Sequence, residues 1–393
     1  MSSTSGPEPP NGDEPAAAAA RRDALVDGLR RVGLIRTAAV EAALRAVPRH
    51  LFLPDVPLAK AYADEAVVTR TGPDGLPTSS ASQPSIVAIM LEQLDVRPGH
   101  RVLEIGAGTG YNAALLAHLA GPGGRVTSVD IDGETAGAAG NSLAAAGVRT
   151  AVVRHADGWS GNRDAAPFDR VEATAGIWDV SPHWVDQLVD GGVLVAPLWL
   201  GPGLQASVAF SRVVRSLRSS SVQTCGFMRL RGAGAGPESY RPLGSWHVSA
   251  ERLDAEAAGV LERLLAGPAT PSPAPQVSRG WLVRLALAGS GALLLADEPR
   301  GRVAAGLFDP AGGSLVLAEG TGGWLGHWSP QTVSCRGGDE LLPALLAVLA
   351  EPEPLEVEQL HLLAVRREDP LPDPGSRRTW LLDRPAHRFL VWA

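Results

Sequence analysis

Apolar runs that suit buried strands alternate with runs that suit helices through the middle of the chain. Strand-like runs begin at Arg101, Arg125, Thr150 and Phe168, and each of the first three is followed by a helix-forming stretch or a short turn. Strands that alternate with helices along a chain are typical of a parallel sheet covered on both faces. We therefore expect an α/β fold with a doubly wound sheet between about residues 101 and 217.

Helical spacing also precedes this region. Leu25 and Leu29 lie one turn apart, and Thr37 is placed to cap a second helix that ends at Pro48. Residues 1–20 hold few large apolar groups, so we expect a disordered tail there. The two helices are expected to pack on the sheet.

The pattern changes after residue 230, where a Gly- and Ala-rich junction interrupts the apolar periodicity. The order of the following segments predicts a C-terminal α+β domain over residues 240–393. The proline-rich stretch 267–275 is expected to be an extended, exposed linker. The segments expected beyond the junction are helices at 253–265 and 340–349 and strands at 281–286, 314–317, 355–365, 379–382 and 388–392.

Composition narrows the class of protein. The chain has 393 residues, a net charge of −7 and a pI near 5.8, which argues against a broad nucleic-acid surface. We see neither an apolar run long enough for a membrane span nor a signal-peptide pattern, so we expect no membrane association and a cytoplasmic location. Cys225 and Cys335 lack partners at metal-ligand spacing, and we expect buried thiols and no metal. His247, His327 and His361 are scattered and are expected to be structural.

The strongest local signal is the stretch from Val102 to Tyr111, which reads VLEIGAGTGY. A buried strand containing Glu104 runs into glycines at alternate positions and then into a helix. Glycines at 106, 108 and 110 allow a tight turn and a close approach of backbone to ligand. The helix start offers free N–H groups, so the stretch predicts a nucleoside site for a dinucleotide, a flavin or S-adenosylmethionine.

Acidic residues follow the next two strands. Asp130 comes at the end of the second strand, at a spacing typical of a carboxylate that accepts from ribose hydroxyls. Asp157 and Gly158 come after the third strand. The alternative is that both aspartates are only turn residues, because Asp and Gly favour turns.

These motifs resemble class I S-adenosylmethionine-dependent methyltransferases. The stretches AVPRHLFLP at 46–54, AYAD at 61–64, SQPSIVA at 82–88 and PFDRV at 167–171 further resemble protein-L-isoaspartate O-methyltransferases, over about residues 22–230. The resemblance implies a methyltransferase domain at 21–230 that binds S-adenosylmethionine. The residues that it implies for the cofactor are Glu104, Gly106, Gly108, Asp130, Asp157 and Gly158.

A hydroxyl-rich segment precedes the glycine stretch. Ser80 and Ser82 lie just before Pro84 and a predicted helix, where hydroxyl and N–H donors could hold a substrate carboxylate. The alternative is an ordinary solvated loop with a helix cap. The resemblance favours the first interpretation and implies roles for Ser82 and Ser80 in orienting the acceptor. Two departures from the family stand out: Ser80-Ala81 replaces a threonine and a larger aliphatic residue, and Glu172 interrupts the fourth strand.

Methyl transfer to an aspartyl or isoaspartyl carboxylate requires little beyond positioning, because that group, with a pKa of about 4, is already ionised at neutral pH. The methyl ester would then close to a succinimide when the next backbone amide attacks it. Three hypotheses follow: general repair of isoaspartyl damage, modification of an aspartate in a ribosomally made precursor peptide, and a nucleotide-binding regulator without catalysis.

We favour the second hypothesis on sequence grounds. The long C-terminal part, the junction CGFM at 225–228 and the closing HRFLVW at 387–392 resemble actinobacterial methyltransferases of peptide natural-product clusters, including FxLD and lanthipeptide-type systems. The expected partner is a peptide or protein bearing Asp or isoaspartate, recognised in part by the C-terminal domain.

Overall fold

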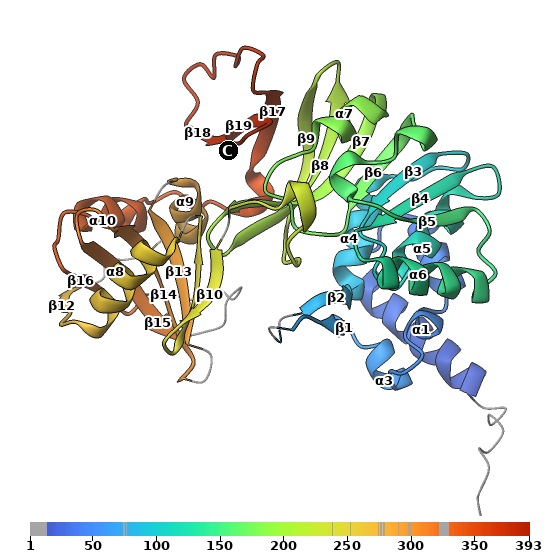
Figure 1. Cartoon of the computed structure of the whole chain (residues 1–393), viewed down its shortest axis with the longest axis horizontal. Helices are drawn as coiled ribbons and strands as arrows, with labels where there is room; N and C mark the ends of the chain where they lie inside the picture. The colour runs from blue at the N-terminus through green and yellow to red at the C-terminus, as the bar shows by residue number, and fades with distance from the viewer. Residues whose placement is uncertain are drawn as a thin grey trace, which may run out of the picture. The chain divides into compact units, whose positions relative to one another are not determined.

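The structure is a computed structural model that describes residues 14–393 apart from 74, 76, 238, 252, 274, 276, 278, 279, 290, 298, 299 and 322–329. It divides into two compact units. Figure 1 colours the chain by residue number, from blue at the N-terminus to red at the C-terminus. The first unit runs to Thr174 and includes Gln187–Val189. The second comprises Ala175–Asp186 and Asp190–Ala393. His327, named above as a structural histidine, lies outside the described residues.

The first unit contains the expected parallel sheet. Its strands lie in the order β6-β3-β4-β5, and each neighbouring pair is parallel. Chain order reverses between β3 and β6, because the chain moves outward from β3 to β5 and then returns to the other side of β3. Ligands bind at such a reversal, beyond the carboxyl ends of the strands. The strands are β3 (Arg101–Ile105), β4 (Arg125–Asp130), β5 (Ala151–His155) and β6 (Phe168–Ala173).

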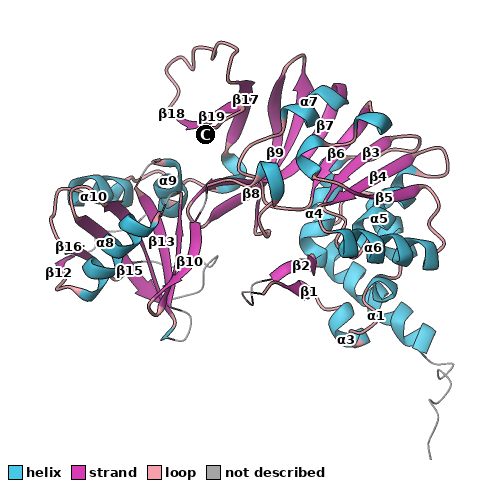
Figure 2. Ribbon diagram, viewed as in Figure 1, coloured by secondary structure: helices cyan, strands magenta, loops and turns pink. Residues whose placement is uncertain are grey.

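Helices cover this sheet (Figure 2). Helix α5 packs against β3, β4 and β5, α6 packs against β4 and β5, and α4 packs against β6. The short apolar runs are buried along nearly their whole length, as a sheet covered by helices requires. The expected doubly wound α/β fold is confirmed. The helices are α4 (Pro84–Leu94), α5 (Tyr111–Ala120) and α6 (Gly133–Ala145).

The N-terminal region differs from the expectation of a tail over residues 1–20. Residues 1–13 lie outside the described part of the chain, but helix α1 spans Glu14–Arg31 and buries Ala18. Alanine has the highest helix propensity, so the alanine run extends the helix although it carries little apolar area. Helix α2 (Ala38–Ala46) begins as expected, with the Thr37 hydroxyl accepting from the Val40 N–H at 3.3 Å.

Short elements lie between α2 and α4. They are the 3₁₀ helix η1 (Arg49–Phe52), α3 (Leu58–Ala61) and the antiparallel strands β1 (Val67–Thr71) and β2 (Pro77–Ala81). Later in the same unit lie the 3₁₀ turns η2 (Gly158–Ser160) and η3 (Arg163–Ala165).

The second unit contains antiparallel strands in the order β18-β19-β17-β9-β8-β7. The β8–β9 hairpin turns at Val214, whose φ is 57° and whose N–H donates to the Asp190 carboxylate at 2.9 Å. The serines fill strand β9. The elements are α7 (Pro182–Gln187), β7 (Leu188–Gly201), β8 (Leu204–Val213), β9 (Ser216–Cys225), η4 (Gly232–Gly234), η6 (Val357–Gln359), β17 (His361–Arg366), β18 (Thr379–Asp383) and β19 (His387–Trp392).

A separate seven-stranded antiparallel sheet forms the rest of this unit, in the order β10-β11-β13-β14-β15-β16-β12. Three helices accompany it. The elements are β10 (Ser239–Leu243), β11 (Trp246–Ala250), α8 (Ala255–Ala266), β12 (Thr270–Pro273), α9 (Trp281–Leu287), β13 (Ala292–Asp297), β14 (Arg302–Asp309), β15 (Ser314–Thr321), β16 (Thr332–Arg336) and α10 (Leu342–Ala350).

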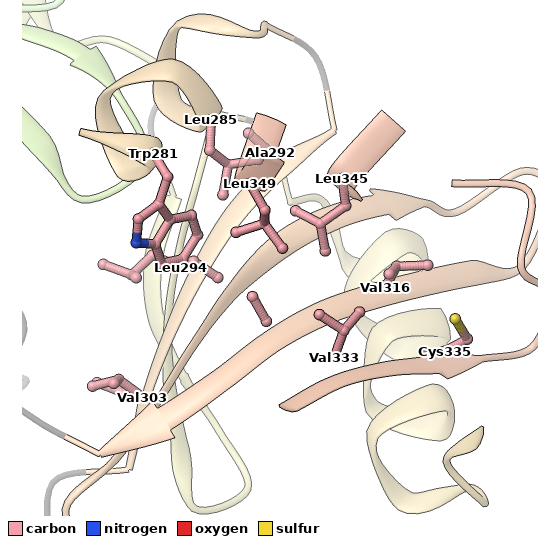
Figure 3. Close-up of a cluster of buried hydrophobic side chains, with 13 residues drawn as sticks. Trp281, Leu285, Ala292, Leu294, Val303, Val316, Val333, Cys335, Leu345 and Leu349 are labelled. Carbon is pink, nitrogen blue, oxygen red and sulfur yellow. The ribbon is translucent and has the colours of Figure 1, made fainter. Parts of the chain in front are cut away.

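Both faces of the seven-stranded sheet are buried. Leu294 packs into a cluster with Trp281 of α9 and Leu345 of α10, shown in Figure 3, whereas its neighbours Leu293 and Leu295 pack into a second cluster that includes residues of α8. Successive strand residues point to opposite faces, so the uninterrupted run ALLLA serves two cores. This sheet therefore has a hydrophobic core of its own.

Three expectations for the C-terminal part differ from the structure. Residues 281–286 are helix α9 and not a strand, because a short apolar run fits either element and Gly280, at a φ of 82°, starts a helix. The stretch 267–275 is extended and mostly exposed at its described residues, as expected, but it contains edge strand β12 and is not a free linker; prolines are tolerated there because one side of the strand is unpaired. Strands from His361 onward pair through β17 with β9, so the expected single domain over 240–393 is divided between two sheets.

Cys225 and Cys335 are buried and unpaired, as expected. Within the described residues, no helix is long and apolar enough to cross a membrane.

Candidate functional site

The glycine turn lies where β3 ends and α5 begins. Gly106, Gly108 and Gly110 have φ values of 100°, 52° and 86°, which side chains rarely tolerate. A Cβ on Gly106 would lie 2.7 Å from the Thr174 Oγ1. Gly110 is the N-cap of α5 and has no side chain to cap it. The Thr109 hydroxyl accepts from the first N–H group of the helix, that of Tyr111, at 3.4 Å, and the N–H groups of the next residues have no acceptor within the helix.

Asp130, at the end of β4, holds this turn. Its Oδ2 accepts from the N–H groups of Ala107 at 3.0 Å and Gly108 at 3.2 Å, and its Oδ1 accepts from Asp132 N at 3.0 Å. The residue is only 9% exposed. A carboxylate has about four acceptor positions, so three accepted bonds leave room for another donor. Asp130 thus has a turn role and retains capacity for a ligand hydroxyl.

Asp157 lies at the end of β5 and caps the turn that follows. Its Oδ1 accepts from Trp159 N at 2.9 Å. A Cβ on Gly158 would lie 2.5 Å from the Ile105 Cγ2, so this glycine allows the turn after β5 to pack against the end of β3. Asp130 and Asp157 therefore both have the turn role that was the alternative interpretation. Both also lie at the carboxyl ends of adjacent strands, where a ligand would bind.

Glu104 and Glu172 meet below the turn. They are register partners on β3 and β6, and they are 0% and 1% exposed. The side-chain amide of Asn112, from α5, donates to Glu104 Oε1 at 2.9 Å and to Glu172 Oε2 at 2.7 Å. The Ser128 hydroxyl also donates to Glu104. Glu172, the acid that interrupts the fourth strand, is thus buried against the helix that follows the turn.

Burial dominates the ionisation of this pair. It raises the pKa of Glu104 to about 8, against the hydrogen bonds from Ser128 and Asn112, which lower it. It raises the pKa of Glu172 to about 7, against the hydrogen bond from Asn112. Both carboxyl groups therefore titrate near neutral pH.

The hydroxyl-bearing segment is partly a strand. Ser80 lies in β2 opposite Val68, and Ser82 lies between β2 and α4. A Cβ on Gly108 would lie 3.5 Å from the Ser80 backbone oxygen. The structure therefore brings the backbone of the candidate acceptor segment next to the glycine turn, although the two are separated by many residues in sequence.

Arg49 joins the two parts of the site. It is 1% exposed, and its Nε donates to the Ala61 carbonyl at 3.0 Å while its Nη2 donates to the Ser82 carbonyl at 2.8 Å. Its guanidinium lies 5.0 Å from the ring centre of Tyr111, the first residue of α5. Burial lowers its pKa. Its Nη1 is buried and has no hydrogen-bond partner among the described residues.

Sequence reasoning missed three contributors. Arg49 was noted only as part of a motif, although a lone arginine in an apolar stretch is a signal of a specific partner. Asn112 gave no signal, because its partners are set by strand pairing. Asp64 carries the helix cap that was expected within the hydroxyl segment: its Oδ1 accepts from Ser85 N at 2.8 Å, and its carbonyl accepts from Gln83 Nε2 at 2.9 Å.

A parallel sheet with a glycine turn at its switch point and an acid after the second strand is common to nucleotide-binding α/β proteins, and class I S-adenosylmethionine-dependent methyltransferases are one class of them. The sequence model of the family described as protein-L-isoaspartate(D-aspartate) O-methyltransferase matches residues 20–233, more than half of the chain. The chain belongs to this family. It is a carboxyl O-methyltransferase that uses S-adenosylmethionine, and the hypothesis of a regulator without catalysis is set aside.

Individual relatives agree. A protein-L-isoaspartate O-methyltransferase of Methanopyrus kandleri is 42% identical over 178 residues, which cover 45% of this chain and 76% of the relative. One from Rhodopseudomonas palustris is 36% identical over 233 residues, 59% of this chain and 91% of the relative. A solved protein-L-isoaspartate O-methyltransferase, 22% identical, shares the fold with a TM-score of 0.52 over 87% of this chain and 96% of its own.

Proposed function

We propose that the protein methylates a side-chain or isoaspartyl carboxylate of a peptide held between the segment at Ser80–Ser82 and the glycine turn. The observation that carries this proposal is the approach of the Ser80 backbone to Gly108, with Arg49 fixing Ser82 beside it. The acceptor is ionised at neutral pH and needs no general base. Positioning of its oxygen is then the main requirement on the protein.

The residues of the site fit the cofactor. The glycine turn leaves no side chain in the way, the start of α5 presents free N–H groups, and Asp130 has a spare acceptor position for a ribose hydroxyl. Glu104, Gly106, Gly108, Asp157 and Gly158 are assigned to the same site. When bound, S-adenosylmethionine supplies the methyl group that the acceptor oxygen takes from the sulfonium.

On the acceptor side, the Ser82 hydroxyl is assigned to donate to the carboxylate, and Ser80 supports the same segment. The positive charge of Arg49 lies behind them and favours an anionic acceptor. Substitution of Ser82 by Ala removes one hydrogen bond to a charged group, a loss of about 1.5–3 kcal/mol. We expect kcat/KM for the peptide to fall roughly 10- to 150-fold with little change in KM for the cofactor.

The test is mass spectrometry of the full chain with S-adenosylmethionine and two short peptides that differ only in Asp or isoaspartate. Methylation of either peptide, reduced in Ser82→Ala and retained in the exposed Ser160→Ala, supports the assignment. Equal loss in both variants, or full activity in Ser82→Ala, contradicts the role of Ser82.

The finer function that we propose is modification of an aspartate in a ribosomally made precursor peptide. The seven-stranded sheet supports it, because it has its own core on both faces and is available for recognition rather than for catalysis. A precursor peptide with its leader should then have a markedly lower KM than the core segment alone. Equal KM values for the two would contradict this function.

General repair of isoaspartyl residues is the second candidate. The solved isoaspartyl methyltransferase favours it, since that fold extends over 87% of this chain and so over much of the second unit. Under this function the simple isoaspartyl peptide reacts, the aspartyl peptide does not, and a leader brings no gain.

A further inference from the structure

Two carboxyl groups face each other inside the first unit at the reversal of strand order. Glu104 and Glu172 occupy opposed positions on β3 and β6, and both are essentially inaccessible to water. Glu104 lies two residues before Gly106, and Glu172 lies two residues before Thr174, whose hydroxyl donates to the Gly106 carbonyl at 2.7 Å. The pair is thus directly connected to the glycine turn.

A single amide group joins the pair. Asn112 has two side-chain N–H donors, and its nitrogen donates to both carboxyl groups, at 2.9 and 2.7 Å. Asn112 is the second residue of α5, so its own backbone N–H is one of the free donors at the helix start. Any change in the distance between the two carboxyl groups therefore moves the helix start that faces the ligand.

The charges around the pair are unfavourable to two ionised groups. The charged neighbours that act on Glu104 within the described residues are Glu172 and Asp130, and both are acidic. Ser128 and Asn112 supply hydrogen bonds but no positive charge. Two buried like charges next to one amide repel each other strongly, and protonation of either carboxyl group removes this repulsion.

We propose that Glu172 is a positioning residue for the cofactor turn: acting through Asn112 it fixes the Glu104 carboxyl group, and protonation of the two acids keeps the turn in its binding geometry. This inference rests on the proposed cofactor site at Gly106–Gly110. It concerns a residue that departs from the aliphatic residue expected at this position of the fourth strand.

The direction of the pH effect follows from burial. Burial raises the pKa of both carboxyl groups above the ordinary value of 4.5, so the folded protein retains a proton that the unfolded chain has lost. Both groups are protonated below pH 7, and the protons are lost as the pH rises, from Glu172 through about 7 and from Glu104 through about 8. Cofactor affinity should therefore be highest on the acid side of this window and fall across it.

The experiment is calorimetric titration of the full chain with S-adenosylhomocysteine between pH 6 and pH 9. We expect the wild-type affinity to fall about tenfold or more across this range, the size of a shift of one pKa unit. Glu172→Gln keeps an acceptor for Asn112 but cannot ionise, so it should bind as the wild type does at pH 6 and lose the change in affinity near pH 7, while the change near pH 8 that belongs to Glu104 remains. Glu172→Leu removes the contact and should bind more weakly at every pH.

The matched control is Glu134→Gln, a glutamate whose side chain is 81% exposed and paired with Arg70. It should keep the wild-type pH dependence. The ligand's own amino group titrates in the same way with every variant and cancels in the comparison. In steady-state kinetics, Glu172→Gln should weaken the pH dependence of KM for the cofactor but leave KM for the peptide as in the wild type.

A second readout needs no ligand. Infrared spectroscopy of the native protein at pH 6 should show a protonated carboxyl band that disappears towards pH 9 and is reduced in Glu172→Gln. If Glu172→Gln and the wild type share one pH dependence and the same carboxyl band, the proposal is overturned while the cofactor site stands. Failure of the folded wild type to bind S-adenosylhomocysteine at any pH would instead overturn the assignment of the cofactor site.

Discussion

Substitution of Arg49 by lysine tests how the segment at Ser80–Ser82 is held in place. Lysine keeps the positive charge but loses the planar fork that reaches Ala61 and Ser82 at the same time. One of the two backbone carbonyls is then left buried without its donor. Such an unsatisfied group costs about 1–3 kcal/mol, which is the destabilisation expected for Arg49→Lys.

The same change should reach catalysis through Ser82. If the lost contact is the bond to the Ser82 carbonyl, kcat/KM for the peptide falls roughly 5- to 150-fold, the rate equivalent of 1–3 kcal/mol. Thermal unfolding measures the first effect, and steady-state kinetics with peptide and cofactor varied separately measures the second.

Arg45 is the matched control, four residues away in sequence. It pairs with Asp23, Asp27 and Glu41, yet its side chain is 31% exposed, and Asp23 and Asp27 are more than half exposed while Glu41 is 18% exposed. Exposed pairs contribute about 0–1 kcal/mol, so Arg45→Lys should be nearly silent although it has more ion pairs. If Arg45→Lys destabilised the protein as much as Arg49→Lys, the argument from burial would be refuted.

Three further outcomes are expected. Gly106→Ala forces a side chain into a φ of 100° and into Thr174, so S-adenosylhomocysteine binding should be lost in calorimetry; retained affinity would disprove the tight turn. Asp179 accepts hydrogen bonds from the backbone and the ring of His387. Asp179→Ala should therefore destabilise the protein by about 1–3 kcal/mol and expose the last strands to hydrogen exchange. Unchanged stability and unchanged exchange would show that these bonds contribute nothing. Burial raises the pKa of the Cys225 thiol, so native protein should resist alkylation until it is unfolded; rapid labelling at neutral pH would contradict its burial.

The sequence predicted the fold best where the apolar periodicity of a segment agrees with the glycines or capping residues at its ends. Strands β3, β4 and β6 and the cap at Thr37 follow from local rules, because apolar runs are bounded by glycines or by a capping hydroxyl. The prediction of a strand at 281–286 was wrong, because the apolar run that forms helix α9 has seven residues and is too short to show a helical or a strand period. The sequence did not predict the pairing of β17 with β9, because this pairing joins segments far apart in the chain and no local pattern encodes such a contact.

The candidate site shows the same division. Glu104 and the glycines of the turn are recognisable because their spacing is local. Asn112 and Glu172 are not, since only the parallel register of β3 and β6 brings an acid in the fourth strand against the first turn of a helix. A departure from pattern, such as an acid in a buried strand, is itself a signal that a partner exists, but it does not name the partner.

The two interpretations of Asp130, a turn residue or a ligand of the cofactor, are compatible in physical terms. Its carboxylate accepts three backbone N–H bonds and still has about one acceptor position left, so the group that shapes the turn can also receive a ribose hydroxyl. A variant at this position therefore loses the geometry of the turn together with the ligand bond. Asp130→Asn should therefore lose more cofactor affinity than one hydrogen bond contributes. The side-chain nitrogen of asparagine is a donor, and it would replace one of the two oxygens that accept from backbone N–H groups.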